Sequence, residues 1–357
     1  MPSTIRDVAR AAGVSVATVS RVLNASGPVG ADTRERVRAA ARRLRYVPHE
    51  GARGLVTRRT GAIGVVLPDL YGEFFSEVIR GLDQAARRHG YHLLLSSSHA
   101  DLAEMQAALA TMRGRVDGLV AMLPDLDAAA LREHLPSPDQ LPVVLLNRAA
   151  GGHAALTVDN YGGARAMTRH LLDLGHRRVA MITGAASNSD ARERLRGYRA
   201  ELRRAGIPPE RALEVTGEFT EEGGHAAARR LVALPPAERP TAIFAANDAM
   251  AIGALSALRE VGLRVPEDVA VTGFDDIPMA RFVEPPLTSV HVPIGRLGER
   301  AVERLVAAMR EPDARAAPAA ERCATTLVIR RSCGAPAPHP AIAVTPAEAS
   351  PTRRRPR

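Results

Sequence analysis

The sequence predicts a small all-α helix-turn-helix domain followed by a larger α/β domain with two lobes of doubly wound parallel sheet. Residues 4–45 have helical periodicity interrupted by turn signals, whereas from residue 61 onward apolar strand-like runs alternate with helix-like stretches. The length of 357 residues also favours several domains, because a single hydrophobic core stops growing at about 250–300 residues.

Three helix-like segments fill the N-terminal region, over residues 4–11, 16–23 and 31–44. Thr4 and Asp7 have the spacing of a capping box at the first segment, and Gly13 closes it. Ser15 precedes the second segment in the position of an N-cap. Because apolar residues recur at helical spacing in all three segments, we expect them to share a small core.

The region from residue 61 to residue 333 alternates between two patterns. It opens with a continuous apolar run at 63–67, which is typical of a parallel strand covered on both faces. Further strand-like stretches lie at 91–95, 118–122, 143–146, 179–182, 214–216, 242–245 and 269–273. Helix-like stretches lie at 75–89, 101–113, 128–134, 163–174, 192–205, 222–234, 249–261 and 296–309. This order predicts parallel sheets with helices on both faces.

The positive charge is concentrated at the two ends of the chain. Residues 1–60 carry a net charge of +8 and the tail from Ala335 carries +3, which leaves the rest of the chain nearly neutral. A basic head on a neutral body is typical of a nucleic-acid-binding module, because Arg releases counterions from phosphates. The tail, residues 334–357, is rich in Pro, Ala and Arg, so we expect it to be disordered.

Composition and motifs argue against other function classes. Cys323 and Cys333 form no CxxC pair and have no His at a metal-ligand spacing, so we expect no disulfide framework, no metal site and no cofactor. The chain has no run of about 20 apolar residues and no apolar leader, which predicts a cytoplasmic protein. It has no GxSxG, GxxxxGK(S/T) or HExxH signature. The side chains of Asp275 and Asp276 are expected to point apart, which argues against a catalytic pair. We therefore expect no catalytic residues and no enzyme activity.

Six stretches of the sequence have distinctive local patterns. The longest is TIRDVARAAGVSVATVSRVLN at 4–24, and the others are YVP at 46–48, RTGAIGV at 59–65, LGHRRV at 174–179, ANDAMA at 246–251 and VTGFDD at 271–276. Together these stretches resemble the LacI/GalR family of DNA-binding repressors over residues 4–333. The resemblance implies a helix-turn-helix head over 1–47 and a hinge helix with linker over 48–60. It also implies a two-lobed ligand-binding and dimerisation domain over 61–333, of the periplasmic sugar-binding-protein type.

The resemblance assigns DNA contacts to the head. The second helix of a helix-turn-helix lies in the major groove with its first turns facing base edges. Val16 and Ala17 would therefore choose the operator sequence, and Arg21 would contact a base, since Arg can bond guanine in two places. The other head residues expected at the DNA are Thr4, Ser15, Thr18, Ser20 and Asn24, with the last three at phosphates. For Val16 and Ala17 the alternative is packing within the head.

Residues 49–56 match the hinge helix of the family. Leu55 falls where the family has a leucine that wedges into the minor groove, and Arg53 would lie beside it near the DNA backbone. Gly51 and Gly54 each cost about 1 kcal/mol relative to Ala in a helix. We therefore expect this short helix to order only when a dimer partner and DNA both hold it.

The resemblance also implies a ligand in a cleft between two lobes, approximately 61–159 with 290–320 and 160–289 with 321–333. Ligands of open α/β sheets bind beyond the carboxyl ends of the strands. The candidate ligand-binding residues that follow strand-like runs are Asp69, Tyr71, Phe74, Phe75, Asp159, Asn188, Asp190, Arg194, Phe219, Asn247 and Asp275. By resemblance Arg194, Asn247 and Asp275 bond the ligand, and such groups suit a polyhydroxyl compound. Core packing of Phe74 or Phe75, a surface position of Arg194, and loop or helix capping by the carboxylates remain alternatives.

The resemblance therefore implies a homodimeric, ligand-responsive transcriptional regulator that binds a pseudo-palindromic operator in double-stranded DNA. A sugar or sugar derivative would act as inducer, and a purine-like corepressor of opposite sign is left open. A solute-binding protein of a sugar transporter shares the two-lobed fold, but it would need a secretion signal and no DNA-binding head. The tail has no heptad repeat, so we expect dimers rather than tetramers.

Overall fold

The computed structural model describes residues 3–23, 26–46, 59–150, 152–208, 213–310 and 320–336 of the chain. The chain divides into two compact units. The first unit comprises Met1–Leu70, Glu77–Leu156 and Gly295–Glu321, and the second comprises Tyr71–Ser76, Thr157–Ile294 and Arg322–Arg357, in each case for the described residues. Asn24, Arg53, Leu55 and most of the expected hinge lie outside the described residues.

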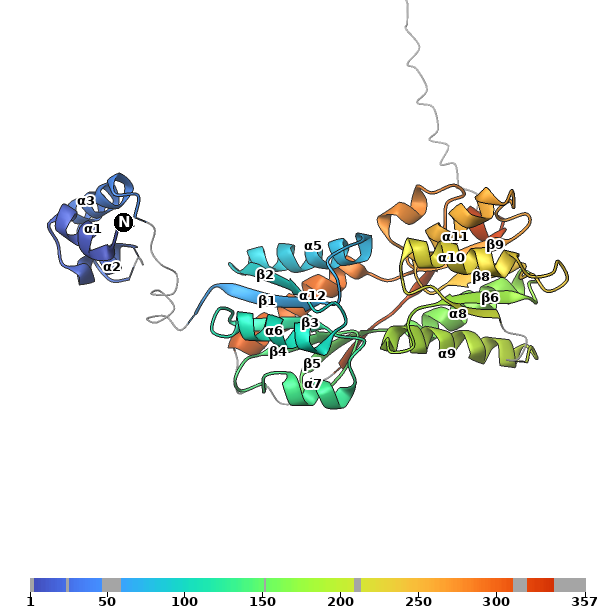
Figure 1. Ribbon diagram of the computed structural model, residues 1–357. Coiled ribbons are helices and arrows are strands. Elements are labelled where there is room, and N and C mark those ends of the chain that lie inside the picture. The colour runs from blue at the N-terminus through green and yellow to red at the C-terminus, as the bar shows by residue number, and fades with distance from the viewer. Residues whose placement is uncertain are drawn as a thin grey trace, which may run out of the picture. The chain divides into compact units, whose positions relative to one another are not determined.

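The head consists of α1 (Ile5–Ala12), α2 (Val16–Leu23) and α3 (Ala31–Arg43), drawn in blue in Figure 1. The capping box is present, because Asp7 N donates to Thr4 Oγ1 at 3.3 Å and Thr4 N donates to Asp7 Oδ2 at 2.9 Å. The three helices bury Val8, Ala9, Ala12, Val19, Val22, Val37, Ala40 and Ala41 against one another. The predicted helix-turn-helix domain is confirmed, and it has a core of its own.

The first unit contains a six-stranded sheet in the order β11-β5-β4-β3-β1-β2. Its strands are β1 (Ala62–Leu67), β2 (His92–Ser97), β3 (Gly118–Met122), β4 (Val143–Leu146), β5 (Ala154–Val158) and β11 (Ala320–Cys323). The neighbours from β5 through to β2 pair in parallel. Its helices are α5 (Glu73–Arg88, of which residues 73–76 belong to the second unit), α6 (Leu102–Met112), α7 (Ala128–His134) and α12 (Ile294–Arg310). A Cβ at Gly81 would lie 1.9 Å from Gly295 O, so α5 and α12 need glycine for their close approach.

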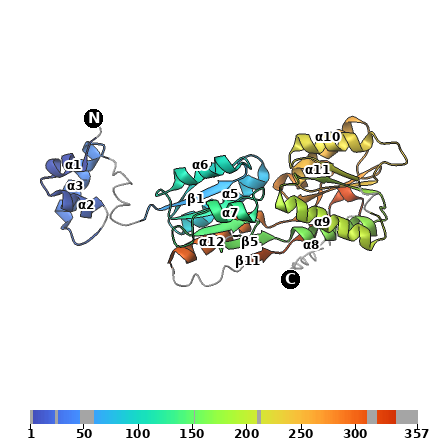
Figure 2. The ribbon, with the colours of Figure 1, turned by 60° about the horizontal axis from the view of Figure 1, so that its bottom comes forward.

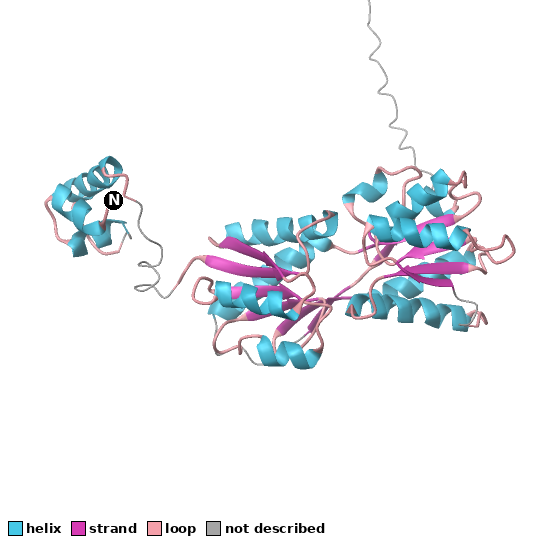
Figure 3. Ribbon diagram, in the orientation of Figure 1, coloured by secondary structure: helices cyan, strands magenta, loops and turns pink. Residues whose placement is uncertain are grey.

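The second unit contains a six-stranded sheet in the order β12-β10-β9-β8-β6-β7. Its strands are β6 (Val179–Thr183), β7 (Leu213–Thr216), β8 (Ala242–Ala245), β9 (Ala270–Asp275), β10 (Thr288–His291) and β12 (Thr326–Val328). Only the β10–β12 pairing among those described here is antiparallel. The helices α8 (Asn160–Asp173) and α9 (Ser189–Arg204) cover one face, and α10 (Glu221–Val232) and α11 (Asp248–Glu260) cover the other, as Figures 1 and 2 show. The expected doubly wound architecture is confirmed, with strands between helices in each unit (Figure 3).

The sequence interpretation was wrong about several short elements. It missed β5, β10, β11 and β12, because these strands have three to five residues and no long apolar run. It also assigned residues 71–76 to the first lobe, whereas they belong to the second unit. A hydrogen bond from Met279 N to a Glu73 carboxylate oxygen, at 2.8 Å, holds this segment to the short 3-10 helix η2 (Pro278–Arg281).

Candidate functional site

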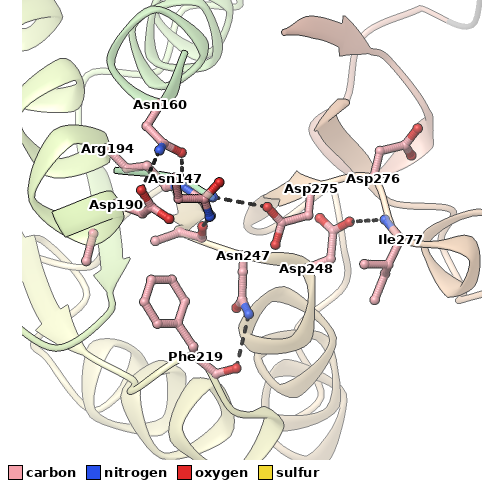
Figure 4. Close-up of polar contacts among 12 residues, drawn as sticks. Asn147, Asn160, Asp190, Arg194, Phe219, Asn247, Asp248, Asp275, Asp276 and Ile277 are labelled. Atoms are coloured by element: carbon pink, nitrogen blue, oxygen red, sulfur yellow. Dashed lines mark hydrogen bonds and ion pairs between the residues drawn. The ribbon is translucent and has the colours of Figure 1, made fainter. Parts of the chain in front are cut away.

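Arg194 on α9 is a buried guanidinium of the second unit, 4% exposed, that donates three hydrogen bonds. Its Nε donates to Asn160 Oδ1 at 2.8 Å, and its Nη2 donates to Asp275 Oδ1 at 3.1 Å. Its Nη1 donates to the carbonyl oxygen of Ala246, which directly follows β8. These partners come from α8, from the residue after β8 and from the end of β9, and Figure 4 shows Asn160 and Asp275 beside Arg194. The surface alternative for Arg194 is therefore wrong.

The start of α9 explains why Arg194 and Asp190 face this cluster. Asn188 is the N-cap, and its Oδ1 accepts from Asp190 N at 3.0 Å and from Ala191 N at 3.1 Å. Asp190 and Arg194 are one helical turn apart and therefore share a face of α9. Asp190 Oδ1 accepts from Asn160 Nδ2 at 2.9 Å, so Asn160 connects the carboxylate to the guanidinium.

Two aromatic rings flank the guanidinium. The guanidinium carbon of Arg194 lies 3.8 Å from the ring centroid of Phe274 and 5.9 Å from that of Phe219. Phe219 has a positive φ of 65°, and Asn247 holds its carbonyl oxygen through a 3.0 Å hydrogen bond from Nδ2. A Cβ at Gly184 would lie 2.2 Å from the Phe219 ring, so a glycine is needed for this ring position. Phe74 and Phe75 form a separate edge-to-face pair with centroids 5.4 Å apart.

A left-handed turn at the end of β9 orients Asp275. Asp275 and Asp276 have φ values of 104° and 56°, which residues other than glycine seldom adopt. Ser289 Oγ accepts from Asp276 N at 3.1 Å, and Asp248 Oδ2 accepts from Ile277 N at 2.8 Å. Ser289 Oγ also donates to Asp248 Oδ1 at 2.6 Å. Asp248 and Ser289 therefore fix the turn that points Asp275 at Arg194.

The two neighbouring carboxylates at this turn have different partners, as expected. Asp275 bonds Arg194, whereas Asp276 pairs with His291 Nδ1 at 3.0 Å and with Arg330 Nη2 at 2.7 Å. Figure 4 shows Asp276 directed away from Asp275. They do not form a pair that shares one substrate position.

Burial raises the pKa of the Asp275 carboxyl to about 6, with Arg194 opposing this effect and Asp190 adding to it. Burial also raises the pKa of Asp248 well above its usual range, and the charge of Asp275 contributes. The cluster thus holds one guanidinium and several carboxyl groups close together in a buried position. Such a site favours ligands that supply hydrogen-bond donors to the carboxylates.

The remaining predicted ligand residues have local roles in the described structure. Asp159 is the N-cap of α8, and its Oδ1 accepts from Gly162 N at 3.2 Å. Asp69 Oδ1 accepts from Leu70 N at 2.6 Å, and Tyr71 is 77% exposed. Asn247 is the N-cap of α11, with Oδ1 accepting from Met250 N at 3.0 Å. The structure thus gathers Asp190, Arg194, Phe219, Asn247 and Asp275, and gives Asp159 the helix-capping role that the sequence left open.

Helix α2, the second helix of the head, has distinct buried and exposed sides. Val19 and Val22 are buried in the head core, whereas Val16, Ala17 and Arg21 are exposed. Val16 is 41% exposed, so packing inside the head does not explain its position. The remaining expected DNA contacts of the described head are Thr4 in the capping box, Ser15 and Thr18 joined by a 2.9 Å hydrogen bond, and Ser20.

Asp117 holds the chain directly before β1. Its carboxylate accepts from Thr60 N at 2.6 Å, from Thr60 Oγ1 at 2.9 Å and from Gly61 N at 2.9 Å. Sequence reasoning did not select Asp117, Asn160 or Asp248 as site residues, although Asp248 follows the strand-like run 242–245. A signal for the other two was their place directly before β3 or at the start of α8.

Comparison with known proteins decides the family. The profile for bacterial regulatory proteins of the lacI family matches residues 4–49, and the profile for the periplasmic binding protein-like domain matches residues 168–333. The ribose operon repressor of Escherichia coli K12 is 40% identical over 314 residues, which cover 87% of this chain and 94% of that protein. The chain belongs to the LacI family. It is a ligand-responsive, DNA-binding transcriptional regulator, and the solute-binding alternative is not favoured.

Other similar proteins are also transcriptional regulators. The HTH-type transcriptional repressor PurR of Haemophilus influenzae strain PittEE is 36% identical, with coverage of 87% and 92%. A lac repressor dimer bound to operator and the anti-inducer ONPF superposes with a TM-score of 0.81 at 30% identity, covering 93% and 99%. A LacI-family regulator from Enterococcus faecium with bound ribose gives a TM-score of 0.67 at 27% identity, covering 76% and 98%. These named relatives are regulators rather than enzymes.

Within the described residues, none of the helices combines the length and the apolar character that a membrane crossing requires. The same part of the chain contains no group of three or more His, Cys, Asp or Glu side chains arranged to hold a metal ion.

Proposed function

We propose that this LacI-family regulator is a repressor whose inducer is a free aldopentose of the ribose type. The observation that carries the proposal is the buried cluster in which Arg194 lies between Asp275 and the Asn160–Asp190 pair, beside the ring of Phe219. A guanidinium only donates hydrogen bonds and an ionised carboxylate only accepts them. Sugar hydroxyl groups do both, so adjacent hydroxyls can satisfy both kinds of group at once.

The charge of the cluster favours a neutral sugar over a phosphorylated one. Asp190 and Asp275 oppose the single positive charge of Arg194, and burial makes any further negative charge costly. A ring hydroxyl brings no charge, and the apolar face of a sugar can stack on Phe219. The proposal draws further support from the similarity to a ribose operon repressor and to a regulator with bound ribose.

The DNA-binding half of the proposal concerns the head. We propose a homodimer that binds a pseudo-palindromic operator, with Val16, Ala17 and Arg21 at base edges and Thr18 and Ser20 at phosphates. The exposure of Val16, Ala17 and Arg21 on α2 supports these roles. The sugar would release the operator by binding one arrangement of the protein more tightly than the other, and it would leave chemically unchanged.

Calorimetric titration of the purified full chain with D-ribose, ribose 5-phosphate, hypoxanthine and guanine tests the effector. We expect saturable binding of D-ribose and no binding of ribose 5-phosphate. A duplex selected from a random DNA pool then supplies the operator for fluorescence anisotropy, in which D-ribose should lower the affinity of the protein for DNA. Binding of none of the four compounds, or of the phosphate ester in preference to D-ribose, would contradict the proposal.

Corepression by a purine is the second candidate, and the 36% identity to PurR favours it. The same two measurements separate the candidates. A purine corepressor would bind in the calorimeter and raise operator affinity, whereas the proposed inducer lowers it. Arg194→Gln should abolish binding of D-ribose, and Arg21→Ala should abolish operator selection while D-ribose affinity stays unchanged.

A further inference from the structure

Asn160 is buried at the first position of α8 and contacts two charged groups of the proposed sugar site. Its Oδ1 accepts from Arg194 Nε, and its Nδ2 donates to Asp190 Oδ1. We infer that Asn160 is a positioning residue, which fixes the plane of the Arg194 guanidinium and thereby sets which pentose epimers the site accepts. This inference rests on the proposed function of the site.

The chemistry of the amide explains why an asparagine occupies this position. A primary amide has one acceptor oxygen and one donor nitrogen, so it can face a cation on one side and an anion on the other. Rotating the amide by 180° would direct N–H toward the guanidinium and oxygen toward the carboxylate, and both contacts would be repulsive. The orientation of Asn160 is therefore determined by its two neighbours, and it in turn determines theirs.

The three protein contacts of Arg194 leave little freedom for its guanidinium. Nε bonds Asn160, Nη1 bonds the carbonyl oxygen of Ala246, and Nη2 bonds Asp275. A guanidinium has five N–H groups in one plane, so two N–H groups remain for a ligand at fixed positions. A sugar epimer whose hydroxyl points to the other face of the ring cannot meet these donors without leaving one unsatisfied, which is costly in a buried site.

Asn160 also keeps Arg194 paired with Asp275 rather than with Asp190. Asp190 and Arg194 are one turn apart on α9, at a spacing that favours a direct ion pair. The amide instead bonds both groups, and the guanidinium reaches across to β9. Without the amide, we expect Arg194 to turn toward Asp190 and to leave Asp275 without its cation.

The first experiment compares Asn160→Ala, isosteric Asn160→Asp and the wild-type chain by titration with D-ribose, D-arabinose, D-xylose and D-lyxose. We expect Asn160→Ala to weaken D-ribose binding about tenfold or more and to bring the four affinities closer together. A general loss of stability would instead weaken all four sugars by one factor. The control is Thr168→Val on the same helix, whose hydroxyl donates to Ala164 O and which should keep the wild-type ranking.

The pH dependence of Asn160→Asp supplies a second readout. At pH 8 the new carboxylate would face that of Asp190, and we expect sugar binding to be weaker than in the wild type. When one of the two carboxyl groups is protonated, a hydrogen bond can form between them. The introduced carboxyl group can then still accept from Arg194. The ratio of variant to wild-type affinity should therefore rise between pH 8 and pH 5.5.

A ligand-free measurement keeps this test independent of the proposed sugar. The carboxyl of Asp275 is titrated by carbon NMR in the wild type and in Asn160→Ala, with Asp190, Arg194, Asp248 and Asp276 as the charged or titratable groups around it. We expect its pKa to rise further in the variant, because Arg194 moves away. An unchanged pKa together with an unchanged epimer ranking would overturn the role of Asn160. Failure of the wild type to bind any pentose would contradict only the proposed function.

Discussion

The two units share one strand order but differ in the polar and charged side chains that they bury. Each sheet follows the same pattern, β11-β5-β4-β3-β1-β2 in the first and β12-β10-β9-β8-β6-β7 in the second. The buried polar or charged side chains described in the first unit are Ser98 and His153. The second unit buries Asn160, Thr168, Thr183, Asn188, Asp190, Arg194, Glu201, Asp248, Thr272, Asp275, Thr288, Ser289 and Ser332. A common topology therefore supports an almost entirely apolar interior in one case and a charged network in the other.

Equivalent strand ends show where this difference originates. β4 and β9 occupy corresponding places in the two sheets. β4 is followed by Asn147 with a φ of 66°, and β9 ends in Asp275 with a φ of 104°. The chain thus adopts a left-handed conformation at both strand ends. Of these two turns, only the one at β9 has a carboxylate paired with a buried guanidinium. The fold provides the turn, and the residue placed there provides the chemistry.

The largest expected effect is that of Arg194→Met, because it removes the only guanidinium from the buried cluster. We expect D-ribose affinity to fall about 100-fold or more, since each lost charge-assisted hydrogen bond is worth about 1.5–3 kcal/mol. Arg80→Met on α5 is the matched control from the first unit, because Arg80 pairs with Glu77 at the surface. Calorimetry should show unchanged D-ribose affinity for the control. Equal losses in the two variants would remove the functional distinction between the units.

The next largest effect is a pH dependence of sugar binding that arises in the second unit alone. The pKa of Asp275 is raised to about 6, and hydroxyl donors bind its ionised form. D-ribose affinity should therefore be constant above pH 7 and fall by up to about tenfold per pH unit below pH 6. Because the folded pKa exceeds the unfolded one, the contribution of Asp275 to stability has the opposite sign and decreases as pH rises from about 4 to 6. Asp275→Asn should remove both slopes, and a slope that persists in this variant would assign the titration to another group.

The extent to which the sequence predicts this site depends on how far apart the interacting residues lie along the chain. Asn247 and Asp275 were identifiable because they follow strand-like runs within recognisable motifs, and Arg194 because it follows the strand-like run 179–182 and matches an arginine of the family. Asn160 was not, because its role depends on α8 and α9 lying side by side, so that residues 34 positions apart share a hydrogen bond. The contact between Asp248 and Ser289 spans 41 positions and also depends on the sheet. Parallel strands and helices have local periodic signals, whereas side-chain partners across elements do not.

A second charged group, the carboxylate of Glu201, is buried in the second unit and is expected to contribute to its stability. Its carboxylate is 1% exposed and accepts from Arg165 at 2.7 Å and from Arg204 at 2.7 Å, with Arg169 at 3.3 Å. Burial raises its pKa, but the hydrogen bonds from the three arginines outweigh burial and lower the pKa to about 2. Since the folded pKa is depressed, this stabilisation is complete above about pH 5 and is lost as pH falls toward 2.

We expect Glu201→Gln to reduce the free energy of unfolding by about 1–3 kcal/mol at pH 7, less than for a fully buried pair because the arginines are partly exposed. Urea denaturation measures the change. Glu77→Gln on α5 is the counterpart in the first unit, and it should cost at most about 0.5 kcal/mol. A similar cost in both variants would show that the buried position of Glu201 contributes nothing beyond a surface ion pair.

The smallest expected effect concerns the buried apolar strands that the two units have in common. Ile63 in β1 and Ile182 in β6 are both fully buried and occupy corresponding strands of the two sheets. Ile63→Val and Ile182→Val each remove one methylene group, so each should lower the free energy of unfolding by about 1 kcal/mol. Urea denaturation should give similar values, and neither variant should change D-ribose affinity by more than about twofold. A much larger loss of sugar binding in Ile182→Val would mean that the apolar packing of the second unit, and not only its strand-end residues, is adapted to the ligand.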